Sequence, residues 1–255
     1  MRTLLVIAFA ASASLAQVQG AGGAAAGLGK VYEASGKSAA AQGLQRKMNT
    51  TLIRAVAREK STSRTAASRT QRATPSVSAG SANAPSRQVT VFKPNPRSNY
   101  LNELANELGS TPEEREQLQL LFATTKEAFE NEVAAKGRSK DIAAAFTFFI
   151  ATSVTVYRND PEPSDAAVDN LWSGMSSALT EMPEVQNLTD AEKQQLYDML
   201  VGLSGFLLAG YMQGQTGDAD TEKIFQQLAG VLIQTVLKTD PNKLRFTKDG
   251  LDIAS

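Results

Sequence analysis

Apolar side chains recur every three or four residues through most of residues 96–255, which is the spacing of one face of an α-helix. Glycines, prolines and short polar turns divide this pattern into six segments. The expected helices lie at about residues 99–108, 112–136, 140–157, 165–179, 190–211 and 220–237. The pattern therefore predicts an all-α fold, a single bundle of five to six helices.

Two of these helices are expected to begin with a capping box, in which a threonine and a glutamate three residues later satisfy backbone amides at the helix start. Thr111 with Glu114 forms one box, and Thr189 with Glu192 forms the other. The helix at 140–157 is apolar on nearly every side, which is typical of the middle of a bundle. The alternative for it is a membrane span, but the segment is short for a span and contains several hydroxyl side chains.

Three glycines, Gly202, Gly205 and Gly210, interrupt the helix expected at 190–211. Each costs about 1 kcal/mol relative to alanine inside a helix, so we expect close packing against another helix as compensation. The tail at 243–253 alternates apolar and polar residues around Asp249-Gly250, a turn signal. It is expected to form either a small hairpin or an extended strap on the bundle.

The composition changes before residue 96. Residues 17–95 are rich in alanine, serine and glycine, which favours a disordered arm that buries little apolar surface. Within it, residues 44–58 have apolar positions at helical spacing and cations nearby. The candidate surface-binding residues of the arm, in or next to this segment, are Arg46, Lys47, Arg54, Arg58 and Lys60. The segment is either an amphipathic helix for an anionic membrane surface or a partner, or a transient helix in a solvated linker.

The first sixteen residues have the pattern of a signal peptide. Arg2 precedes an apolar run at 4–11, and Ser14-Leu15-Ala16 provides the small residues that signal peptidases accept. The apolar run is too short to cross a bilayer, which needs about 20 residues. We therefore expect an exported protein, either periplasmic or extracellular.

The net charge of zero conceals two oppositely charged parts. Residues 17–95 carry twelve cations and two acids, which gives 12 − 2 = +10, and residues 96–255 carry 13 cations and 24 acids, which gives 13 − 24 = −11. A basic arm on an acidic domain fits attraction to an anionic envelope polymer, a peripheral membrane contact, or the domain itself. Nucleic acid is not an expected partner, because the cations are spread among small residues and only Tyr32 and Phe92 offer rings for stacking.

The chain has no histidine and no cysteine, which excludes Ser-His-Asp triads, ordinary zinc sites, thiol nucleophiles and iron–sulfur clusters. The acids Asp218, Asp220 and Glu222 approach the start of a calcium loop, but that loop's glycine and final glutamate are missing. No metal site, cofactor or catalytic residue is predicted.

The segment at 157–165 is the candidate interaction loop, because it gathers polar groups on a connection stiffened by Pro161 and Pro163. Its alternative is a plain interhelical turn with Ser164 as the next helix cap. Trp172, about two turns further on, is expected to form a wall of the same site. The candidate residues are Tyr157, Arg158, Asn159, Asp160, Glu162, Asp165 and Trp172.

The sequence Tyr157-Arg158-Asn159-Asp160, the helix containing Trp172 and the stretch at 207–213 together resemble an uncharacterised family of exported bacterial all-helical proteins. The resemblance covers about residues 94–255 and leaves the arm outside. It implies a bacterial source and one helical domain, and it implies no activity.

These observations favour a non-enzymatic binding or structural protein of the bacterial cell envelope, with an unknown protein or an anionic envelope polymer as partner. Two alternatives stay open. One is a carboxylate-dependent hydrolase of envelope polymers, since two acids suffice for glycoside hydrolysis. The other is a membrane-inserting or pore-forming helical protein. The sequence leaves the oligomeric state open.

Overall fold

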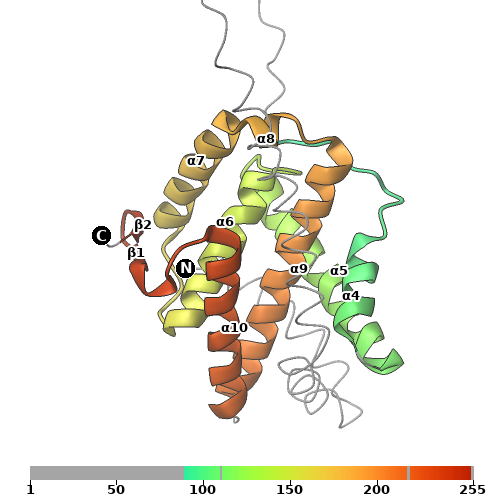
Figure 1. The fold of residues 1–255 in the computed structure, drawn as a ribbon, viewed down its shortest axis with the longest axis vertical. Coiled ribbons are helices and arrows are strands. Elements are labelled where there is room, and N and C mark those ends of the chain that lie inside the picture. Colours follow the sequence, from blue (N-terminus) through green and yellow to red (C-terminus); the bar gives the residue numbers. More distant parts are fainter. Residues whose placement is uncertain (1–88, 110, 217–218, 254–255) are drawn as a thin grey trace, which may run out of the picture.

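The computed structural model describes residues 89–109, 111–216 and 219–253. The signal peptide, the segment at 44–58 and Asp218 lie outside these residues. The elements in chain order are α4 (Tyr100–Leu108), α5 (Pro112–Ala135), α6 (Ile142–Arg158), α7 (Asp165–Glu181), α8 (Pro183–Gln186), α9 (Asp190–Gln215), α10 (Ala219–Leu237), the 3-10 turn η2 (Pro241–Lys243), β1 (Leu244–Thr247) and β2 (Gly250–Ile253) (Figure 1).

The predicted all-helical bundle is confirmed, with six main helices in the described part of the chain and the short α8 between α7 and α9. Both capping boxes form, at Thr111 with Glu114 and at Thr189 with Glu192. The tail is a hairpin, in which Leu244 faces Ile253 and Thr247 faces Gly250. Local sequence signals thus set the ends of the elements.

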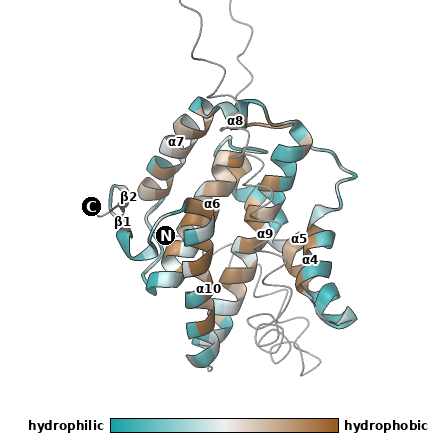
Figure 2. Ribbon diagram, viewed as in Figure 1, coloured by the Kyte–Doolittle hydropathy of each residue, from teal (hydrophilic) through white to brown (hydrophobic). Residues whose placement is uncertain are grey.

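Helices α6 and α9 form the middle of the bundle. Helix α9 contacts α4, α5, α6 and α10, while α7 and β1 cover the other side of α6 (Figure 1). Figure 2 shows the apolar residues concentrated on these inner helices, with hydrophilic residues on α4 and on the outer face of α10. None of the described helices combines the length and the hydropathy that crossing a membrane requires.

The glycines of α9 allow its neighbours to approach closely, as the sequence predicted. A Cβ atom at Gly205 would overlap the side chain of Thr125 on α5, and one at Gly210 would overlap the ring of Phe225 on α10. At Gly202 a Cβ atom would fit tightly, because its nearest neighbours, at 3.2 Å, are the movable ends of leucine side chains. Two of the three glycines are therefore required by packing.

The predicted boundary between arm and domain at residue 96 lies too late in the chain. Residues 89–95 pack on the bundle: Val91 forms a β-bridge with Asp141, and the Phe92 amide donates to the Lys140 carbonyl at 3.1 Å. The Phe92 side chain is 3% exposed and meets the Tyr197 ring edge-on. Burial of the Phe92 side chain offsets the conformational entropy that is lost when this short segment is ordered. The polar composition of the neighbouring sequence concealed this contribution.

Candidate functional site

The candidate loop begins where α6 ends, and its first residues are held by the bundle. Asn159 is the C-cap of α6 in a left-handed conformation, with φ 53°. Its side-chain oxygen accepts a hydrogen bond from the Tyr211 hydroxyl of α9, which in turn accepts one from the Gln215 amide at 2.7 Å. Asparagine tolerates this conformation better than most residues. Asn159 is therefore a structural cap, and its side chain is engaged.

Tyr157 lies against α10. A Cβ atom at Gly230 would be 2.8 Å from the Tyr157 ring, so only glycine lets the ring lie this close to the helix. The Tyr157 hydroxyl donates to Asn242 Oδ1 in η2 at 2.9 Å. This contact joins residues 85 positions apart in the chain and fixes one wall of a cavity.

That cavity, which we call the α6–α10 cavity, has a volume of about 380 Å³ and opens to solvent. Its lining is polar and consists of Tyr157, Arg158, Lys223, Gln226, Gln227 and Asn242. Arg158 Nε donates to Asp160 Oδ2 at 2.9 Å, and Lys223 is largely exposed beside Asp220 at 3.9 Å. The cavity presents two cations, three amides and a phenol, which suits recognition of anionic and hydroxyl groups.

Sequence reasoning missed four of the six lining residues, Asn242 of η2 and three residues of α10. Lys223, Gln226 and Gln227 lie on the polar side of α10, where they look like ordinary solvent-facing residues. Their helical spacing of three and four residues placed them on one face, but nothing local indicated that this face meets Tyr157.

The second half of the candidate loop lies away from the cavity. The Ser164 hydroxyl caps α7 by accepting from the Ala167 amide at 3.2 Å, as expected, and it also donates to the Lys248 carbonyl at 3.4 Å. Glu162 is half-buried and Asp165 is exposed at the start of α7. Neither lines the α6–α10 cavity.

Trp172 does not belong to the same site as Tyr157. Its indole Nε1 donates to Asp141 Oδ2 at 2.9 Å, at the opposite end of α6. Asp141 is also the N-cap of α6, and its other oxygen accepts from the Ala143 amide at 2.9 Å. Since α7 runs back along α6, two helical turns carry Trp172 away from the loop. The expectation that Trp172 forms a wall beside Tyr157 is wrong.

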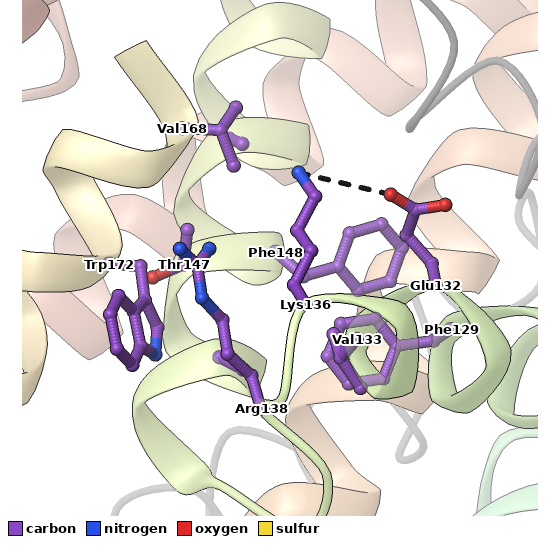
Figure 3. A pocket seen from close by; sticks show the side chains of 11 residues that line it. Phe129, Glu132, Val133, Lys136, Arg138, Thr147, Phe148, Val168 and Trp172 are labelled. Atoms are coloured by element: carbon purple, nitrogen blue, oxygen red, sulfur yellow. Dashed lines mark ion pairs between the residues drawn. The ribbon is translucent and has the colours of Figure 1, made fainter. Parts of the chain in front are cut away.

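Trp172 instead borders a small apolar pocket between α5, α6 and α7 (Figure 3). The Arg138 guanidinium lies 3.9 Å from the centre of the indole and pairs with Asp169 at 2.8 Å. Lys136 spans the pocket mouth and pairs with Glu132 at 3.8 Å. The pocket has a volume of only about 40 Å³, and the charges around it are paired. The contacts of Arg138 with Trp172 and Asp169 therefore mainly hold α7 against the α5–α6 turn.

A buried charge network ties α5 to α9. Lys126 Nζ lies 2.6 Å from Asp198, whose side chain is only 3% exposed, and 4.0 Å from Glu130. Glu130 also pairs with Lys140. Burial raises the pKa of the Asp198 carboxyl above its ordinary value, and the hydrogen bond from Lys126 partly offsets this.

Two buried tyrosines flank this network. Burial raises the pKa of the Tyr100 hydroxyl to about 12 and raises that of Tyr197 further. The Tyr197 hydroxyl has no hydrogen-bond partner among the described residues. The carboxyl groups of Asp198 and Glu130 face the amino groups of Lys126 and Lys140 rather than an open cleft. The network therefore acts as a charge-compensated tie between helices.

Among the described residues, no three acidic side chains gather as a metal site. Asp220 and Glu222 occupy the first turn of α10, where the helix dipole stabilises acids.

A comparison with protein families matches residues 1–254 to a family described as a family of unknown function (DUF6683). The match extends well before residue 94, so it includes the arm that the predicted resemblance left outside. No curated protein and no solved structure matches the chain.

Proposed function

The chain belongs to the DUF6683 family, whose function is unknown, and from this premise we propose that it is an exported, non-enzymatic binding protein of the bacterial cell envelope. Its helical domain binds an anionic envelope polymer, of which peptidoglycan is the test case. The observation that carries the proposal is the lining of the α6–α10 cavity.

The cavity is suited to a polymer rather than to an enclosed small molecule. It opens to solvent, and its lining offers donors from Arg158, Lys223 and the amide of Gln227. Arg158 contacts Asp160 through Nε, and its two terminal nitrogens have no hydrogen-bond partner among the described residues. Guanidinium groups bind carboxylates through such paired donors.

The arm supports the same function from the sequence side. Its charge of 12 − 2 = +10 attracts an anionic polymer over distances up to the Debye length, about 8 Å at physiological salt. The signal peptide predicted at residues 1–16 supports delivery to the compartment that contains such polymers. The arm then raises the local concentration of the polymer, and the cavity supplies the contact.

Co-sedimentation of the full chain with purified peptidoglycan tests the proposal. We expect Arg158→Gln and Lys223→Gln each to weaken binding about tenfold, because a hydrogen bond to a charged group contributes about 1.5–3 kcal/mol. Arg97→Gln is the matched control, since it removes one exposed cation of the domain outside the cavity.

High salt is expected to weaken peptidoglycan binding by the wild-type chain and by the control to a similar degree. Equal weakening by all three substitutions would mean that only the overall charge matters, and binding by none of the proteins at low salt would refute a role in polymer binding.

A further inference from the structure

A second concave site lies on the other side of α6, between α7, the end of α10 and the hairpin. This groove, which we call the hairpin groove, has a volume of about 450 Å³, within the range of about 300–1,000 Å³ found for small-ligand sites. Its main apolar lining residues are Ile150, Leu171, Met175, Leu237, Leu244 and Leu251.

The hairpin is held beside α7 by polar contacts at its turn. The Asn170 side-chain amide donates to the Asp249 carbonyl at 2.8 Å, and the Ser164 hydroxyl donates to the Lys248 carbonyl at 3.4 Å. Beyond the turn, Gly174 of α7 provides no side chain, and a Cβ atom there would meet nothing within 4 Å. The turn is therefore pinned while the space beside Gly174 stays open.

The lining has little to offer a polar ligand. The Asn170 amide is already engaged, and most remaining side chains are aliphatic or the thioether of Met175. Methionine adapts its shape to irregular apolar ligands. A flexible hydrocarbon chain matches such a surface better than a planar or hydroxylated molecule does.

Two lysines are chain neighbours of lining residues, although the one ionisable side chain of the lining itself is that of Asp249. Lys238 adjoins the lining residues Leu237 and Thr239, and Lys243 adjoins Leu244. Both lysines are exposed, and neither has an ion-pair partner among the described residues. Of the other two cations of this region, Arg245 is the Cα partner of Asp252 in the hairpin register, and Lys248 lies 3.9 Å from Asp249.

We propose that the hairpin groove binds a long-chain fatty acid, with its hydrocarbon chain along Leu171, Gly174 and Met175 and its carboxylate beside Lys238 and Lys243. An apolar groove next to two unmatched lysines has the chemistry of a single-chain anionic amphiphile. The site is separate from the α6–α10 cavity, so its occupation and polymer binding are tested independently.

Titration of the full chain with cis-parinaric acid, a fatty acid whose fluorescence rises in apolar surroundings, tests this site. We expect Gly174→Phe to weaken binding more than about tenfold, because the ring occupies the volume of the hydrocarbon chain. Ser173→Phe is the matched control, since it adds the same ring to an exposed position of α7 that is outside the groove lining; it is expected to bind as the wild type does. Equal affinity of the two variants would overturn the proposal.

The lysines are tested by comparing the acid with its alcohol analogue. The double variant Lys238→Gln with Lys243→Gln is expected to bind cis-parinaric acid several-fold more weakly than the wild type and to bind the alcohol equally well. Unchanged binding of the acid would overturn the assignment of its carboxylate. Binding of vesicles of phosphatidylglycerol without binding of the monomeric acid would also overturn the proposal, because the ligand would then be a membrane surface.

Discussion

At the scale of single residues, two glycines in helices have opposite surroundings. Gly210 of α9 lies against the Phe225 ring with no room for a Cβ atom, whereas Gly174 of α7 faces open space. The intrinsic cost of glycine in a helix is the same at both positions, about 1 kcal/mol relative to alanine. Only the packing differs, so the pair separates helix propensity from tertiary contact.

We expect Gly174→Ala to raise the free energy of unfolding by up to about 1 kcal/mol, through helix propensity. Gly210→Ala is expected to lower it by about 1–3 kcal/mol, because the added methyl group forces α9 and α10 apart. Urea unfolding of both variants measures this. Stabilisation of both would show that the α9–α10 contact is looser than the structure has it.

At the scale of elements, a carboxyl group that is almost completely buried joins α9 to α5. Asp198 lies 2.6 Å from Lys126, and burial raises its pKa above the ordinary value of 3.8. Because the folded state then binds this proton more tightly than the unfolded state, Asp198 stabilises the fold most at pH values below the unfolded pKa. Its contribution falls as the pH rises from about 3.8 through the raised folded pKa.

Asp198→Asn removes this titration while keeping the shape of the side chain. We therefore expect the stability of the wild type relative to the variant to decrease as the pH rises through that window. Other carboxylates affect both proteins alike, so the difference isolates Asp198. Urea unfolding of the two proteins at several pH values checks this, and a difference that does not change with pH would contradict the raised pKa.

At the scale of the whole molecule, residues 89–95 tie the end of the arm to the bundle. Phe92 is buried against Tyr197, and the Asn95 amide donates to the Gln194 side chain of α9 at 2.7 Å. At the start of α6, Val91 forms a β-bridge with Asp141, and the Ile142 amide donates to the Thr90 carbonyl. The Asp141 carboxyl group also accepts a hydrogen bond from the Trp172 indole. Residues 89–95 are therefore part of the folded unit and lie against the start of the central helix α6.

Phe92→Ala in the full chain is expected to lower the free energy of unfolding by about 3–5 kcal/mol, the usual cost of deleting a buried phenyl ring. Lys93→Ala is the control, because its side chain is exposed and its loss is expected to change stability by less than about 0.5 kcal/mol. Thermal unfolding of both variants distinguishes them. Equal stability would show that residues 89–95 are not part of the folded unit.

Much of the fold followed from local patterns. The capping boxes at Thr111 and Thr189, the apolar face of each helix and the Asp249-Gly250 turn each involve neighbours in the chain, so the sequence alone identified the six helices and the turn of the tail; the structure decided between a hairpin and an extended strap. The apolar character of α6 likewise predicted its central position, because a helix without a polar face needs cover on every side.

The candidate site was only partly determined in this way. The sequence indicated Tyr157 and Arg158, but the tertiary structure decided that α10 and η2 complete their cavity and that Trp172 lies at the far end of α6. It also decided that Phe92 belongs to the core. The physical reason is the range of the interactions: caps and helical faces join residues a few positions apart, whereas these contacts join residues up to 105 positions apart and exist only once the helices have packed.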